Sequence, residues 1–276
     1  MTNNFFTIQE RSKHRAGRRG TLVTAHGTYQ TPIIVPAVDD HSQASTSMIW
    51  ANGLTTKAHY HEHQLKHDGG LHGIFHWSGG LISTAGGWEA LNNSQSFQLD
   101  QKGIHVDVQG KQVFLSPEAS AKEAAVAGVD IAVALSDCPP YYSSYDHIKK
   151  HVEQNNRWMK RAAQSHERQQ LKMFGVIEGA GLKEMRQASV DFVTSLGFDG
   201  YEIGGLTKDV PSDELMRLVK ETAPLLPDDQ PRMLSRVSDP AVLQAAVNSG
   251  VDIILASPEA NLAQLNKTLQ KLNDNF

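Results

Sequence analysis

The sequence predicts an α/β protein built as a single (β/α)8 barrel with a small β-sheet at its N-terminus. Short apolar runs alternate with helix-length amphipathic segments along most of the 276 residues, which favours parallel strands joined by helices. Eight such runs can be traced, a number that favours a closed barrel over an open sheet. Several runs end in polar or Gly-rich residues, as barrel strands do where they carry an active site. We expect residues 1–276 to form one domain.

The N-terminal residues 1–31 are expected to form a β-hairpin or small sheet that covers the bottom of the barrel, because β-prone runs flank a turn at His26-Gly27-Thr28. The predicted barrel strands are residues 33–37, 53–58, 80–83, 130–134, 172–177, 200–203, 232–235 and 251–255. The predicted helices are residues 42–50, a segment starting at 116–118, 145–164, 183–195, 212–222, 240–248 and 258–272. An additional hairpin is predicted after the third strand, at residues 97–108 and 111–115.

Composition excludes several classes of protein. An apolar content of 39% and a charged content of 20% are globular values. The single cysteine, Cys138, excludes an internal disulfide framework and fits a reducing cytoplasm. No apolar run approaches the ~20 residues of a membrane span. The net charge of −4 and the short basic clusters at 15–19, 149–150 and 157–161 argue against strong RNA binding by the isolated chain.

Histidines are concentrated after the second predicted strand. They are His59, His61, His63, His67, His72 and His76. Imidazole is a common metal ligand, but the segment lacks a HExxH pattern. We expect neither a metal site nor a cofactor.

Several short sequence motifs are spread along most of the chain. They are Arg18-Arg19-Gly20, Thr24-Ala25-His26-Gly27, Gly69-Gly70-Leu71-His72, Cys138-Pro139-Pro140-Tyr141, Arg157-Trp158, Asp199-Gly200-Tyr201, Gly204-Gly205-Leu206 and Thr222-Ala223-Pro224-Leu225-Leu226-Pro227. In these residues the chain resembles the tRNA-guanine transglycosylases, which exchange guanine in tRNA for a 7-deazaguanine. The resemblance implies a barrel for queuosine-type tRNA modification, with a pocket for a guanine-like base. It also implies tRNA as a partner, bound by this chain or through a partner subunit, and a homo- or hetero-oligomer.

The residues that perform the family's chemistry differ here. In the family's VDxFDxxxP-like segment Asp252 matches the first acid, but the position of the attacking aspartate holds Leu255. The second aspartate, in a TDSGGFQ-like loop, is replaced by Thr84. An FDEC-like segment has Ser136 for its first acid, and a VQGG-like segment has Glu178 for its amide. The zinc-binding, RNA-contacting insert expected after strand eight is missing. Base exchange is therefore not expected, and whether the chain is an enzyme stays open.

Relocated carboxylates are the candidate catalytic groups. We select Glu178 and Asp137, since two carboxylates in one pocket suffice for glycosyl hydrolysis; Asp39, Asp40 and Glu202 are further acids at strand ends. The expected base-binding residues are Thr84, Glu89, Ser136, Glu178, Tyr201, Gly204, Gly205 and Leu255. Cys138 is expected to be a buried structural thiol. Two alternatives remain: a non-catalytic partner subunit or base-binding protein, and a nucleoside glycosidase that uses the relocated acids.

Overall fold

The eight strands form a closed barrel. The last strand pairs with the first, and the first is bridged to the second. The computed structural model describes residues 5–38, 46–85, 97–166, 171–205, 210–274 and 276, and these contain a parallel sheet of eight strands. In spatial order they are β4 (Ile33–Val35), β14 (Ile253–Ala256), β13 (Arg232–Val237), β12 (Gly200–Ile203), β11 (Lys172–Ile177), β10 (Ile131–Val133), β6 (Gly80–Thr84) and β5 (Met48–Asn52). β14 pairs with β4, and a parallel bridge between Ala37 and Trp50 joins β4 to β5. The predicted neighbourhood of first and last strands is confirmed.

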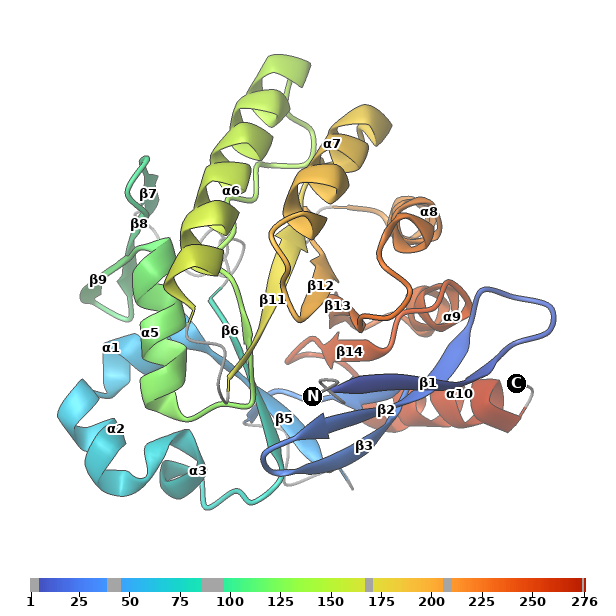
Figure 1. The fold of residues 1–276 in the computed structure, drawn as a ribbon, viewed down its shortest axis with the longest axis horizontal. Helices are drawn as coiled ribbons and strands as arrows, with labels where there is room; N and C mark the ends of the chain where they lie inside the picture. The colour runs from blue at the N-terminus through green and yellow to red at the C-terminus, as the bar shows by residue number, and fades with distance from the viewer. Residues whose placement is uncertain (1–4, 39–45, 86–96, 167–170, 206–209, 275) are drawn as a thin grey trace.

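Helices surround this sheet (Figure 1). They are α1 (Gly53–His59), α2 (Glu62–Asp68), α3 (Gly70–Ile74), α5 (Pro117–Ala127), α6 (Tyr145–Ser165), α7 (Lys183–Thr194), α8 (Ser212–Thr222), α9 (Pro240–Asn248) and α10 (Leu262–Asp274), with a 3-10 turn at Ala223–Leu225. Capping residues define the ends of α5. The side chain of Ser116 accepts a hydrogen bond from the Ala119 N–H at the start of the helix, and Gly128 ends it with a φ of 69°. Among the described residues no helix is long and apolar enough to cross a membrane.

A three-stranded antiparallel sheet lies across the N-terminal end of the barrel, at the lower right in Figure 1. It consists of β1 (Phe6–Arg11), β2 (Arg18–Thr24) and β3 (Gly27–Thr31). Arg18 anchors it by donating from Nε and Nη2 to the two carboxylate oxygens of Asp252, which lies just before β14, at 3.0 and 2.6 Å. Both side chains are fully buried. The first acid of the VDxFDxxxP-like segment is thus a structural anchor.

The predicted extra hairpin after β6 forms part of a second small sheet. It has three antiparallel strands, β7 (Phe97–Leu99), β8 (Ile104–Val108) and β9 (Lys111–Leu115). Its buried side chains form an apolar cluster with α1 and with Trp158 of α6. This sheet therefore stands outside the barrel, beside α5 and α6 (Figure 1).

Two of the predicted elements are wrong. Residues 48–50, predicted as the end of a helix, belong to strand β5, and residues 53–58, predicted as a strand, form helix α1. Both faces of β5 are buried, with Met48 and Trp50 in one apolar cluster and Ile49 and Ala51 in another, so its sequence shows no alternation. The side chain of Asn52 accepts from the Thr55 N–H and starts α1, which overrides the β-propensity of the threonines.

Candidate functional site

Five neighbouring strands bring four polar residues and a glycine together near their carboxyl ends. Thr84, Ser136, Glu178, Gly204 and Ser235 lie at or just after the ends of β6, β10, β11, β12 and within β13. They line one cavity with Val133, Cys138, Val176, Glu202, Ile203, Gly205 and Arg236. The space open to the centre of a water molecule is about 20 Å³, which accommodates about one water. We call this the strand-end cavity; a purine would have to widen it.

The carboxylate of Glu178 is buried at this cavity. The residue is 1% exposed, and its backbone N–H donates to Ser189 Oγ at 3.0 Å. Neither carboxylate oxygen has a hydrogen-bond partner among the described residues. Two glycines leave room for it: a Cβ at Gly204 would lie 3.1 Å from Oε1, and one at Gly205 would lie 2.6 Å from Oε2. The missing side chains of this Gly-Gly turn therefore give Glu178 its place.

Burial is the main reason why the pKa of Glu178 is raised well above its usual value. The guanidinium of Arg186 opposes the rise, and the carboxylates of Asp137 and Glu202 add to it. The backbone N–H of Gly205 also favours the ionised form of Glu178, although its contact with the carboxylate does not have the geometry of a hydrogen bond. A carboxyl group of this kind accepts hydrogen bonds when ionised and donates one when protonated. Glu178 is therefore the group best suited to bind a ligand here.

Asp137 is already paired with a histidine. Its Oδ1 lies 2.6 Å from Nδ1 of His151 on α6, while Oδ2 is buried without a hydrogen-bond partner among the described residues. Burial raises the pKa of Asp137, and the His151 hydrogen bond opposes this. Its neighbour Cys138 is also buried, and burial followed by the charges of Glu178 and Asp137 raises the pKa of the thiol well above its usual value. A thiol that stays protonated is a poor nucleophile, which fits a structural role.

A protein-family model described as queuine tRNA-ribosyltransferase matches residues 13–270. The chain belongs to this family. It is 31% identical over 261 residues to the queuine tRNA-ribosyltransferase of Pediococcus pentosaceus, an alignment covering 90% of this chain and 69% of the relative. It is 32% identical over 262 residues to that of Listeria monocytogenes serotype 4a, with the same coverage. The corresponding protein of Enterococcus faecalis is 30% identical over 263 residues, covering 90% of this chain and 68% of the relative.

Three of the positions that differ from the queuine tRNA-ribosyltransferase pattern lie at the strand-end cavity. Thr84, Ser136 and Glu178 all line the strand-end cavity, as do Gly204 and Gly205. These five of the expected base-binding residues are therefore brought together. Each comes from the carboxyl end of a barrel strand, where the family resemblance placed the base.

Three other expected residues are not part of this group. Leu255, at the attacking-aspartate position, is 1% exposed and packs in the largest apolar cluster without lining the cavity. Tyr201 points to the helix layer, since its hydroxyl donates to the Thr194 carbonyl at the end of α7 at 3.4 Å. Glu89 falls outside the described residues, as do the acids Asp39 and Asp40.

The alternation of side chains along β12 explains the position of Tyr201. Successive residues of a strand point to opposite faces, so Tyr201 and Glu202 cannot both face the interior. Glu202 lines the strand-end cavity. The sequence left this choice open for Glu202, and the structure decides it.

Two functional neighbours were missed from the sequence. Arg186 of α7 is 2% exposed and its charge acts on Glu178, and His151 of α6 holds Asp137. Arg186 does carry a signal, because it falls on the same helical stripe as Ser189, Val190 and Val193, the buried face of α7. A charged residue on an apolar stripe is a candidate for a buried interaction.

The family's zinc site does not fit this chain. Residues 257–261 alone separate β14 from α10, and Cys138 is the single cysteine of the sequence. A zinc site of several cysteines cannot be assembled from these residues. We therefore derive no function through zinc.

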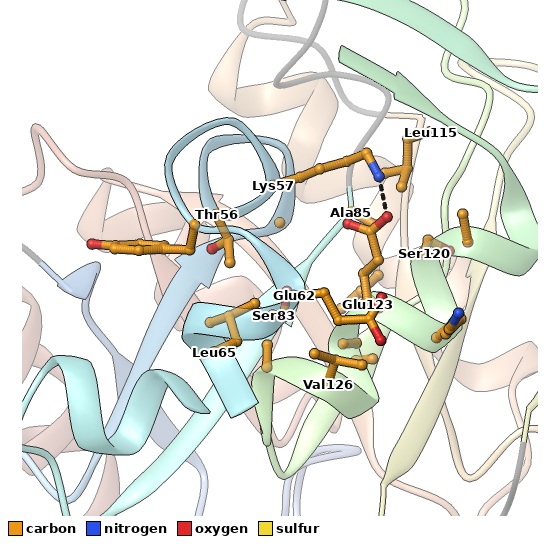
Figure 2. Close-up of a pocket in the computed structure, with 18 of the residues that line it drawn as sticks. Thr56, Lys57, Glu62, Leu65, Ser83, Ala85, Leu115, Ser120, Glu123 and Val126 are labelled. Atoms are coloured by element: carbon orange, nitrogen blue, oxygen red, sulfur yellow. Dashed lines mark hydrogen bonds and ion pairs between the residues drawn. The ribbon is translucent and has the colours of Figure 1, made fainter. Parts of the chain in front are cut away.

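A larger cavity lies outside the barrel, between α1, α2 and α5 (Figure 2), with about 460 Å³ open to the centre of a water molecule. It exists because the face of α5 that borders it carries the small side chains Ser120, Ala124 and Ala127. An ion pair between Lys57 and Glu123 lies at it (Figure 2). Strands β6 and β10 separate this space from the strand-end cavity, because residues of both strands border each of the two cavities.

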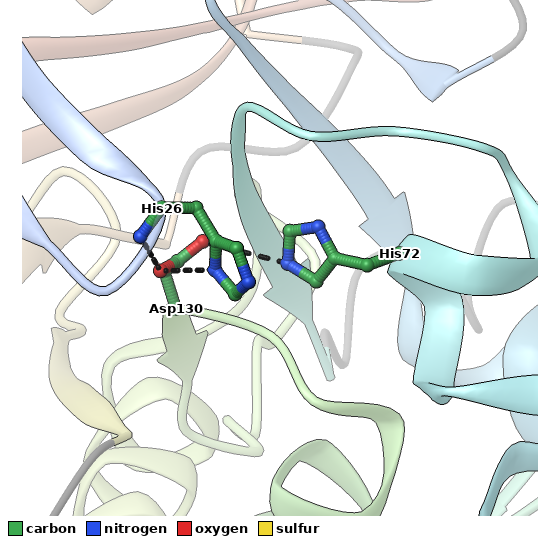
Figure 3. Close-up of side chains that lie close together, drawn as sticks. All are labelled: His26, His72 and Asp130. Atoms are coloured by element: carbon green, nitrogen blue, oxygen red, sulfur yellow. Dashed lines mark hydrogen bonds and ion pairs between the residues drawn. The ribbon is translucent and has the colours of Figure 1, made fainter.

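His26, His72 and Asp130 meet at the N-terminal end of the barrel (Figure 3). His26 Nδ1 lies 2.9 Å from Asp130 Oδ1, His72 Nδ1 lies 2.9 Å from the Trp77 carbonyl, and Asp130 Oδ2 accepts from the Leu81 N–H. The two imidazoles are stacked at 3.7 Å with an angle of 24° between their planes. Since the lone pair of an imidazole lies in its ring plane, one ion cannot face both rings in this arrangement. The hydrogen bond between His26 and Asp130 thus links the β2–β3 turn to the start of β10, and the ring stack packs His72 of α3 against it.

Proposed function

We propose that this chain binds a guanine-like or 7-deazaguanine base in the strand-end cavity, against the Gly204-Gly205 turn. The observation that carries the proposal is the Glu178 carboxylate, which is buried at the cavity with both oxygens unpaired among the described residues. An unpaired buried carboxylate is unfavourable, and a ligand that presents N–H donors relieves it. Guanine and its 7-deaza relatives present two such donors, N1–H and the 2-amino group.

Ser136 supports the same assignment from the neighbouring strand end. It lines the cavity where the family pattern has an acid, and a hydroxyl offers a neutral partner that donates or accepts. The negative charge facing the base is thus supplied from the end of β11. A base bound here widens the cavity, since a purine is much larger than one water molecule.

Base exchange through a covalent aspartate is not part of the proposal. Leu255 is a hydrocarbon side chain within the core, and it cannot form the ribosyl intermediate that splits the exchange into two steps. We propose tRNA as a partner of the chain on the strength of the relatives' name, bound directly or through a partner subunit.

Hydrolysis of an N-glycosidic bond is the second candidate function. It is favoured by one observation, that two carboxylates, Glu178 and Glu202, line the same cavity. Glycoside hydrolysis needs one carboxyl group as an acid and one as a base or nucleophile. Release of free base from guanosine or a 7-deazaguanosine, followed by chromatography, tests it.

Calorimetric titration with a panel of purines and 7-deazapurines tests the binding proposal. We expect selective binding of guanine-like bases, reduced about ten- to hundredfold by Glu178→Ala, since a charge-assisted hydrogen bond contributes about 1.5–3 kcal/mol. Glu184→Ala, at an exposed position of α7, is the matched control and should bind normally. No binding of any base, or equal binding after Glu178→Ala, would overturn the proposal.

A further inference from the structure

Arg186 connects the two loops that flank Glu178. Its Nε donates to the Ala180 carbonyl, after β11, at 2.7 Å, and its Nη2 donates to the Gly204 carbonyl, after β12, at 3.0 Å. Nη1 is buried without a hydrogen-bond partner among the described residues. The path of this side chain requires a glycine at position 179, where a Cβ would lie 2.6 Å from the Arg186 backbone nitrogen and 2.8 Å from its Cγ.

The bond to the Gly204 carbonyl also orients the next amide. In a trans peptide the C=O and the N–H point in opposite directions, so holding the Gly204 carbonyl fixes the Gly205 N–H. That N–H lies on the side of the Glu178 carboxylate and favours its ionised form. Gly205 lies between the two charged groups, where a side chain would not fit. A Cβ added at this position would lie 2.6 Å from Glu178 Oε2 and 3.3 Å from Arg186 Nη2.

Several charged or titratable groups face Glu178. Asp137 and Cys138 approach from the loop after β10, Glu202 from β12 and Arg236 from β13. Asp137 and Glu202 disfavour the carboxylate, and the largest influence in its favour is the Arg186 guanidinium. This guanidinium is 2% exposed, so water screens it little.

We propose that Arg186 is a positioning residue for base recognition, which fixes the peptide between Gly204 and Gly205 and keeps Glu178 available as a hydrogen-bond acceptor. The inference rests on the proposed function for its consequence in binding. An ionised Glu178 selects a base edge that presents N–H donors, whereas a protonated one would also accept an edge that presents acceptors. Arg186 thus acts through Glu178 without lining the cavity itself.

The test measures the ionisation of Glu178 in the free protein, so it does not depend on any ligand. The carboxyl carbon of Glu178 is followed by NMR as a function of pH and assigned by its absence in Glu178→Gln. Arg186→Met should move the titration midpoint to higher pH, and Arg186→Lys should keep it close to that of the wild type. Lys183→Met, which removes an exposed positive charge from the same helix, is the matched control and should leave it unchanged.

Hydrogen exchange of the Gly205 amide supplies the second measurement. It should accelerate in Arg186→Lys, which keeps the charge but loses the forked hydrogen bonds, so the inference remains testable if Arg186→Met does not fold. An unchanged Glu178 midpoint in Arg186→Met, or unchanged Gly205 exchange in Arg186→Lys, would overturn it. If these shifts appear while guanine and 7-deazaguanine fail to bind the wild type, the positioning role stands and the proposed function fails.

Discussion

Replacing Glu178 by glutamine should stabilise the unliganded protein at neutral pH. The carboxylate is buried with both oxygens unpaired among the described residues, and a buried polar group without partners costs about 1–3 kcal/mol. Part of the cost comes from the charge, since a buried charged group costs more than a neutral one, and a neutral amide of the same shape removes that part. Urea unfolding at pH 7.5 should therefore show an increase of about 1–3 kcal/mol in the free energy of unfolding, and the melting temperature should rise by about 2–4 °C per kcal/mol.

The pH dependence of this gain distinguishes the mechanism from better packing. Because the pKa of Glu178 is raised in the folded state above its ordinary value of 4.5, the folded protein binds more protons than the unfolded chain above that pH. Wild-type stability contributed by this group is thus present at low pH and lost as pH rises. The advantage of Glu178→Gln should grow from near zero at about pH 4.5. Glu184→Gln, on the exposed side of α7, should show no such trend. A destabilised Glu178→Gln protein, or a gain independent of pH, would refute the reasoning.

Three further predictions concern other parts of the molecule. Arg18→Met should lower the free energy of unfolding by about 3–5 kcal/mol in urea titrations, because it leaves the Asp252 carboxylate buried without its ion-pair partner; a loss below about 1 kcal/mol would contradict this role. Gly205→Ala should destabilise the chain by about 1–3 kcal/mol and abolish base binding in calorimetry, since its φ is +71° and the new Cβ would contact Glu178; unchanged affinity would be inconsistent with the site. The wild-type chain and Leu255→Asp should both fail to incorporate labelled guanine into tRNA, because Leu255 does not line the cavity, and robust incorporation by either would show the assignment to be wrong.

Most of the barrel could be predicted because its second half follows local rules. Strand 200–203 and helices 212–222 and 240–248 were predicted with the bounds that the structure has. Their signals are short apolar runs, amphipathic spacing and a proline at the start of α9. The errors at residues 48–58 have a different origin. A strand buried on both faces and a short helix started by one asparagine carry little periodicity, so tertiary contacts decide them.

The candidate site was predictable only in part. Parallel strands bring their carboxyl ends together, so the grouping of Thr84, Ser136 and Glu178 followed from the fold. The sequence did not predict which side chains of a strand face the barrel interior. Tyr201 and Glu202 are adjacent, so they point to opposite faces, and either one is compatible with the interior. The cation that acts on Glu178 was not predictable either, because Arg186 comes from a helix and lies near the carboxylate only through the packing of α7.

A structure of this protein with bound 7-deazaguanine would test the account most directly. We predict the base against the Gly204-Gly205 turn, with N1–H and the 2-amino group within hydrogen-bond distance, about 2.7–3.2 Å, of the two Glu178 oxygens and with Ser136 on the same face. A base bound in the cavity between α1, α2 and α5, or one in the strand-end cavity with Glu178 turned away from it, would contradict the account.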